Sequence, residues 1–316
     1  MESRNDVSIR ESPRRPTFGS AIVVVTDASA APRAAVAGTR VDLVGRGPAR
    51  GRTPDVVGHR GSSGLAPENT VPSFRLSRVH GADRIETDVQ LSADGEPFLF
   101  HDDIATRTTD VEQVFPDRAG DPVTSFTWAE LSRLDAGAYF AREFTGTRIP
   151  SLRDVALAAG PRTQVNVELK SPANSSGVEQ VLADALRHDP AWRGLVARRH
   201  VVVSSFDSGS LRTFASLAPE VPVLQIGAIP DDATLAEWAT WAAGVVTNHL
   251  RLAPEDVQRV RRAGLSLSVY TVNDPAQMRA MMALGVDAII TDFPDVLMRL
   301  RRDTGPAPTS RRASSD

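Results

Sequence analysis

Short strand-forming runs alternate with amphipathic helical patterns from residue 54 to residue 302, and this alternation is the feature that most constrains the fold. In residues 178–186, for example, apolar side chains recur at the i, i+3, i+4, i+7 spacing of one helix face. Strands that alternate with helices form parallel sheets with right-handed crossovers. We expect strands over residues 55–58, 84–91, 97–100, 164–169, 200–205, 221–226, 244–247, 265–272 and 287–291.

The second and third strand runs are separated only by residues 92–96, whereas a parallel crossover needs about a dozen residues or more. This pair is therefore expected to form an antiparallel hairpin with a turn at Asp94-Gly95, which leaves eight parallel strands. A doubly wound sheet is the rival, but no Gly-x-Gly-x-x-Gly follows the first strand. The prediction is an α/β chain with a TIM (β/α)8 barrel, a short return strand, and an excursion over the barrel mouth in residues 102–161.

Composition excludes several classes of protein. The formal net charge is −3 at pH 7, so nucleic-acid binding has no electrostatic footprint. No apolar run reaches the ~18 residues that span a bilayer, so no integral membrane segment is expected. The absence of cysteine removes disulfides, thiolate zinc sites and cysteine nucleophiles. The oligomeric state stays open.

Residues 1–53 and 303–316 have the composition of disordered tails. Arg14 and Arg15 precede the apolar stretch 18–25, and Ala28-Ser29-Ala30 resembles a cleavage site, which together favour an export signal weakly. The stretch is short and contains Ser20. We therefore expect a cytoplasmic protein, with export as the alternative.

Charged residues gather where strands of the predicted barrel end, which is where the active sites of such barrels lie. They are His59 and Arg60 after the first strand, Glu86 and Asp88 in the second, His101 after the return strand, and Glu168 and Lys170 at the next parallel strand. Residues two apart in a strand share a face. With the turn centred at residues 93–94, Glu86 is expected to lie roughly opposite His101.

These residue types favour phosphodiester chemistry. The three carboxylates are hard oxygen ligands, which suit Mg²⁺ or Ca²⁺, and such carboxylates at close range need a cation. An arginine and a lysine together grip a phosphate. Two histidines serve as general acid and general base, and the sequence leaves open which is which.

The same residues resemble the glycerophosphodiester phosphodiesterase family, whose pattern is a His-Arg pair, then Glu-x-Asp, then a second His. The matching segments are 57–61 (VGHRG), 67–70 (PENT), 85–89 (IETDV), 101–102 (HD), 107–109 (RTT), 149–152 (IPSL), 167–170 (VELK), 204–206 (SSF), 271–273 (TVN) and 291–294 (TDFP). The resemblance covers residues 55–300. Because many motifs agree in order, it is far more specific than any one of them.

The resemblance implies a TIM barrel that uses a divalent cation to hydrolyse glycerophosphodiesters to sn-glycerol 3-phosphate and an alcohol. It further implies that the glycerol 2-hydroxyl attacks first, giving a cyclic phosphate that water opens. By motif, His59 and His101 are the catalytic histidines, Glu86, Asp88 and Glu168 are the metal ligands, and Arg60 and Lys170 hold the phosphate.

Three further residues near these motifs are open to interpretation. Tyr270 stands where the family usually has Trp, so it is expected to give the glycerol a shorter flat wall with an added hydroxyl. Glu68 either caps the first helix or braces Arg60. Asp292 is interpreted as the start of the helix at Pro294.

Two alternative functions remain. One is a related barrel that acts on lysophospholipids or inositol lipids, which an extended hydrophobic mouth would favour. The other is a barrel that binds phosphoglycerol compounds without catalysis, which loss of a histidine or of the Glu-x-Asp pair would indicate. Lys170 is the single lysine among the 36 basic residues, and its place two residues from a predicted metal ligand makes Lys170→Arg a direct test.

Overall fold

The computed structural model describes residues 53–303. The motifs of the predicted leader, and with them the choice between cytoplasm and export, lie outside the described residues, as does the predicted C-terminal tail. Within residues 53–303, no helix is long and apolar enough to cross a membrane.

Eight parallel strands close into a barrel, as the sequence predicts. The sheet order is β1-β9-β8-β7-β6-β5-β4-β2-β3, and an additional pairing of β1 with β2 closes the ring. The strands are β1 (Asp55–Gly58), β2 (Arg84–Leu91), β3 (Pro97–Leu99), β4 (Gln164–Leu169), β5 (Val201–Ser205), β6 (Val223–Ile226), β7 (Gly244–Asn248), β8 (Ser266–Tyr270) and β9 (Ala288–Thr291). Every predicted strand is present, and β3 alone runs antiparallel to its neighbour.

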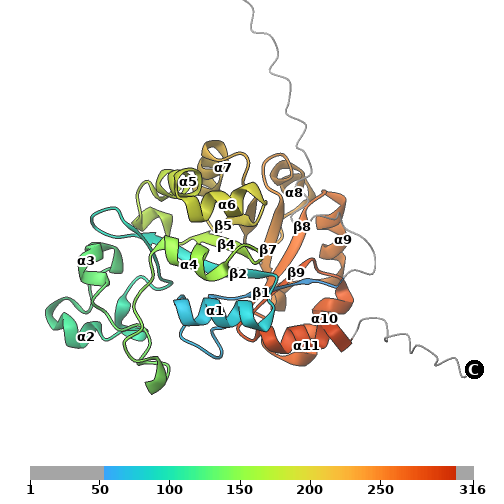
Figure 1. Cartoon of the computed structure of the whole chain (residues 1–316). Coiled ribbons are helices and arrows are strands. Elements are labelled where there is room, and N and C mark those ends of the chain that lie inside the picture. The colour runs from blue at the N-terminus through green and yellow to red at the C-terminus, as the bar shows by residue number, and fades with distance from the viewer. Residues whose placement is uncertain (1–52, 304–316) are drawn as a thin grey trace, which may run out of the picture. The chain divides into compact units, whose positions relative to one another are not determined.

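Helices cover the outside of the barrel (Figure 1). They are α1 (Val71–His80), α4 (Leu152–Ala159), α5 (Val178–His188), α6 (Pro190–Ala197), α7 (Ser208–Leu217), α8 (Asp232–Trp238), α9 (Pro254–Arg262), α10 (Pro275–Leu284) and α11 (Pro294–Asp303). Local sequence sets their starts. In α10, for example, Asp274 accepts hydrogen bonds from the backbone N–H groups of Ala276 and Gln277, and Pro275 needs no donor of its own.

Successive side chains along each strand point alternately to the helices and to the barrel interior, so the strands contribute to two separate cores. On β1, Val56 packs outward against the helices, whereas Val57 packs inside the barrel with Val202, Leu224 and Ile290. On β2, Ile85 and Val89 face the helices in the same way. The residues between them, Glu86 and Asp88, therefore face the barrel interior.

The hairpin corrects the predicted register by one residue. Ser92 N–H donates to the Glu96 carbonyl, and Gly95 has φ +83°, so the loop contains the three residues 93–95 instead of two. Val89 consequently pairs with Leu99, and Phe100 N–H donates to the Asp88 carbonyl. The expected approximate pairing of Glu86 with His101 is off by one residue, because a three-residue loop shifts every cross-strand partner by one.

The long connection between β3 and β4 contains the predicted excursion, although its last helix, α4, belongs to the ring around the barrel. The excursion carries the short helices α2 (Val111–Val114) and α3 (Trp128–Leu131), which Figure 1 shows set apart from that ring. It has a small core of its own that includes Phe98, Phe126 and Leu134. A core of this kind fixes the loops that reach the barrel mouth.

Candidate active site

A cavity of about 190 Å³ opens at the carboxyl ends of the parallel strands. Eight predicted site residues line it: His59, Arg60, Glu86, Asp88, His101, Glu168, Lys170 and Tyr270. The ninth, Glu68, does not line the cavity, but its carboxylate contacts Arg60, which does. The structure thus brings together side chains from β2, β4 and β8 and from the segments that follow β1, β3 and β4.

A larger cavity of about 610 Å³ lies at the opposite, amino-terminal end of the strands. Its lining includes Asp55, Arg78, Asp83 and Arg162, but it holds no histidine and no cluster of carboxylates. Because barrels of this type carry their chemistry at the carboxyl ends of the strands, the smaller cavity is the candidate active site.

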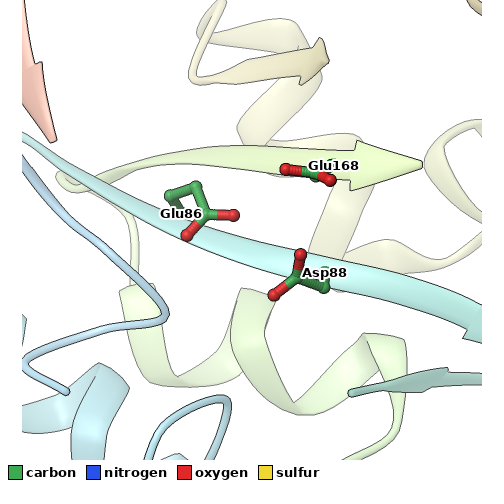
Figure 2. Close-up of side chains that lie close together, drawn as sticks. All are labelled: Glu86, Asp88 and Glu168. Atoms are coloured by element: carbon green, nitrogen blue, oxygen red, sulfur yellow. The ribbon is translucent and has the colours of Figure 1, made fainter. Parts of the chain in front are cut away.

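Three buried carboxylates form the floor of the candidate site. Glu86 and Asp88 on β2 face Glu168 on β4, as Figure 2 shows. Each offers one oxygen within 4.8 Å of the others. Asp88 and Glu168 are paired neighbours in the strand register, so their closeness follows directly from the sheet.

The carboxylates repel one another, and this repulsion contributes to raised pKa values for Glu86 and Glu168. Burial, together with the charges of Asp88 and Glu168, raises the pKa of Glu86 well above its ordinary value. Burial and the charge of Asp88 raise the pKa of Glu168 to about 7, although Lys170 opposes the rise. Among the described residues, Asp88 Oδ1 is buried with no hydrogen-bond donor. The set therefore fits a hard divalent cation, which would supply the missing positive charge.

His59 is held by an aspartate from the far end of the chain. Its Nδ1 lies 2.7 Å from Asp292 Oδ1. Asp292 also accepts hydrogen bonds from the Ser63 hydroxyl and from the Asn273 amide. Burial alone would raise the pKa of Asp292, but the His59 contact and these hydrogen bonds lower it. The interpretation of Asp292 as a helix start is wrong, because its carboxylate turns toward the histidine.

His101 has a matching arrangement. Its Nδ1 lies 2.7 Å from Asp102 Oδ1, and its Nε2 lies 2.9 Å from Lys170 Nζ. A charged lysine only donates, so Nε2 accepts, and Nδ1 carries the proton that is donated to Asp102. Lys170 also reaches Glu168 at 3.4 Å. The single lysine of the chain thus connects the second histidine to the carboxylate floor.

Arg60 lies between the carboxylate floor and Glu68. It adopts φ +52°, a conformation uncommon outside glycine, which directs its backbone N–H to Glu86 at 2.7 Å. Its Nη1 donates to Glu68 at 2.7 Å, and its Nε lies 3.4 Å from Asp88. Glu68 makes no helix cap, so of its two predicted roles the structure shows the contact with Arg60. Arg107 contacts Glu68 as well.

Asn69 lies in the matched segment 67–70 and is a site neighbour that is not among the predicted site residues. Its amide nitrogen donates to Asp88 at 2.8 Å, and its amide oxygen accepts from the Thr87 hydroxyl at 2.7 Å. Asn69 has φ +52°, which asparagine tolerates better than most residues. A residue between Glu68 and α1 therefore fixes the orientation of a floor carboxylate. The motif PENT at residues 67–70 marks this segment, but it does not predict the contact between Asn69 and Asp88.

A closed eight-stranded barrel with histidine, carboxylate, arginine and lysine side chains converging at the carboxyl ends of its strands has the architecture of a TIM-barrel enzyme. The model of the glycerophosphoryl diester phosphodiesterase family matches residues 59–296. The chain belongs to this family.

Known relatives match this chain over most of their own length. A glycerophosphodiester phosphodiesterase of Caldanaerobacter subterraneus is 34% identical over 256 residues, covering 79% of this chain and 98% of the relative. One of Bacillus subtilis is 30% identical over 259 residues, covering 78% and 86%. A phosphodiesterase of Oleispira antarctica, solved in complex with the product sn-glycerol-3-phosphate, is 30% identical with a TM-score of 0.67, covering 79% of this chain and 97% of that one.

Proposed function

We propose that this protein hydrolyses glycerophosphodiesters to sn-glycerol 3-phosphate and an alcohol. The observation that carries the proposal is the pair of histidines, each bonded through Nδ1 to an aspartate, that line one cavity with a carboxylate triad, an arginine and a lysine. Family membership and the product bound in the Oleispira relative support the same reaction.

The two histidines move the protons. Asp292 and Asp102 hold Nδ1 of His59 and His101 respectively, so Nε2 of each ring is the nitrogen that exchanges protons with the substrate. Nε2 of His101 becomes available for this when Lys170, its partner at 2.9 Å, turns to the phosphate. One ring takes the proton of the attacking hydroxyl, and the other donates a proton to the departing alkoxide. The attacking group is the glycerol 2-hydroxyl in a first step and water in a second.

Arg60 and Lys170 bind the phosphate. Lys170 extends over the face of Phe206, with Nζ 6.0 Å from the ring centre, and the Phe206 ring meets Tyr270 edge-on at 6.2 Å between centroids. These two rings form an apolar wall beside the cationic side of the cavity. Such a wall suits the carbon face of glycerol, while the cations meet the phosphate oxygens.

Glu86, Asp88 and Glu168 would hold the divalent cation, and the donor set of oxygens alone favours Mg²⁺ or Ca²⁺. When bound, the cation supplies positive charge that stabilises the negative charge developing on the phosphoryl oxygens. Asn69 and Arg60 orient the carboxylates from the side of Asp88.

The test is release of glycerol 3-phosphate from glycerophosphocholine, with and without EDTA. We expect EDTA to abolish activity and His59→Ala to lower kcat by about a hundredfold or more. His188→Ala, at the exposed end of α5, is the matched control and should behave as wild type. Activity that is insensitive to EDTA, or that survives His59→Ala, would exclude this mechanism.

Exposed apolar side chains near the mouth favour a second candidate substrate, lysophospholipids. Leu65, Phe206 and Leu250 lie in the segments after β1, β5 and β7 and are 41%, 53% and 73% exposed. Tyr139 of the excursion is also exposed, and its hydroxyl accepts a hydrogen bond from the backbone N–H of Glu68. By contrast, Phe126 of the excursion is buried in its own core. The two candidate substrates are distinguished by measuring kcat/KM for lysophosphatidylcholine and for glycerophosphocholine. Both values are compared between wild type and Leu250→Ser, which removes one of these exposed apolar side chains.

A further inference from the structure

Arg107, a residue of the excursion, clamps two carboxylates that belong to different halves of the site. Its Nε and Nη2 donate to Asp102 at 2.5 and 3.0 Å. Its Nη1 and Nη2 donate to Glu68 at 2.8 and 2.7 Å. Asp102 in turn holds His101, and Glu68 holds Arg60. One guanidinium therefore connects a predicted proton-transfer group to a predicted phosphate-binding group.

The backbone that carries Arg107 is fixed by the excursion. Arg107 ends a 3-10 helix, η1 (Ala105–Arg107), and Ala105 and Thr108 on either side are almost fully buried. The side chain itself is 49% exposed. An isolated ion pair at such exposure contributes little, but a fork that meets two carboxylates in bidentate fashion fixes both geometries.

We propose that Arg107 is a positioning residue that holds His101 through Asp102 and Arg60 through Glu68. The proposal rests on the proposed phosphodiesterase function for its kinetic readouts. A carboxylate bonded only to an imidazole rotates about its χ angles, and Arg107 removes that freedom from Asp102. Glu68 shares its charge between two arginines, so Arg60 is drawn less strongly away from a phosphate.

Electrostatics agree with this arrangement. Burial alone would raise the pKa of Glu68, but the hydrogen bond from Arg107 and the charge of Arg60 lower it. The pKa of Asp102 is likewise lowered, since hydrogen bonds from His101 and Arg107 outweigh its burial. Both carboxylates therefore remain ionised at neutral pH and continue to accept from the guanidinium.

The kinetic test compares Arg107→Ala and Arg107→Lys with Arg118→Ala. Arg118 is a matched control, because it is also a half-exposed excursion arginine that meets two carboxylates, Asp121 and Glu130, away from the site. We expect Arg107→Ala to lower kcat about tenfold or more and to raise KM, as loss of an orienting partner does. Arg118→Ala should stay within about twofold of wild type.

Three further measurements separate positioning from a merely structural role. Added guanidinium should partly restore kcat to Arg107→Ala but have no effect on Arg118→Ala. Lysine at position 107 should not restore full activity, because an ammonium cannot bridge both carboxylates. In an Asp102→Ala background, Arg107→Ala should no longer lower kcat, yet should still raise KM through Glu68.

The readout that does not depend on turnover is the NMR signal of the His101 Nδ1–H proton. We expect Arg107→Ala to broaden or shift it, and Arg118→Ala to leave it unchanged. If wild type releases no glycerol 3-phosphate, the proposed function fails while the NMR result still decides the role of Arg107. Kinetics and an NMR spectrum of Arg107→Ala equal to those of Arg118→Ala would overturn the proposal.

Discussion

Replacing Glu168 by glutamine should stabilise the metal-free protein. The pKa of Glu168 rises from 4.5 to about 7 in the folded state because of its burial and the charge of Asp88. A raised folded-state pKa contributes stability that is fully present below about pH 4.5 and is lost as the pH rises through about 7. At pH 8 the ionised carboxylate therefore costs about 3 kcal/mol relative to a neutral side chain of the same shape.

Glutamine keeps the shape and removes the charge. That figure already includes the attraction of Lys170 at 3.4 Å, because Lys170 opposes the rise in the pKa of Glu168. For a domain of this size a gain of about 3 kcal/mol corresponds to a rise in Tm of roughly 6–12 °C at pH 8. At pH 4.5 the two proteins should melt together. The assay is a thermal melt followed by circular dichroism in EDTA across this pH range.

Adding a cation should reverse the order. Wild type at a free cation concentration about 1,000 times Kd gains about 4.1 kcal/mol. Glu168→Gln lacks one ligand, and the order reverses where its own gain stays below about 1 kcal/mol. Glu255→Gln, an exposed substitution on α9, is the control and should follow wild type under every condition. A Glu168→Gln protein that melts below wild type at pH 8 in EDTA would refute the reasoning.

Other predictions concern the groups around the triad. Asp292→Asn should lower kcat at least about tenfold with little change in KM, because His59 loses its charged partner; steady-state kinetics beside a thermal melt distinguishes this from unfolding. Lys170→Arg should lower activity about tenfold, since a planar guanidinium does not fit where a compact ammonium reaches His101; full activity would mean that the lone lysine is chance. Cation affinity measured by calorimetry should weaken as the pH falls below about 7, because the proton on Glu168 competes for the same oxygen, and a pH-independent Kd would contradict the triad as the binding site.

Most of the fold can be predicted from local sequence patterns. The helix starts follow from proline with a capping aspartate, and strand positions follow from short apolar runs. Each of the nine described strands therefore begins and ends within two residues of its predicted bounds. The shared edge of parallel strands also explains why residues from β1, β2 and β4 meet. These features depend on chain segments of about ten residues, which a sequence displays directly.

The contacts that orient the site were harder to foresee. Asp292 lies 233 residues from His59, and the proline that follows it nearby made a helix start the natural interpretation. Arg107 was visible as part of a motif, but its two partners depend on the path of the excursion. The hairpin register changed because one extra loop residue moves every pair. Contacts between loops require the closed barrel before they exist.

The closed barrel also explains why the triad cannot relieve its own repulsion. Asp88 and Glu168 are register partners on adjacent strands, and Glu86 lies two residues before Asp88 on the same face. Moving either strand would break the ladder on both of its sides, since neither β2 nor β4 is an edge strand. Arg60 and Lys170 offset part of the charge, yet the pKa values of Glu86 and Glu168 remain raised. A geometry that the fold enforces, and that costs stability without a counter-ion, is consistent with the proposed cation site.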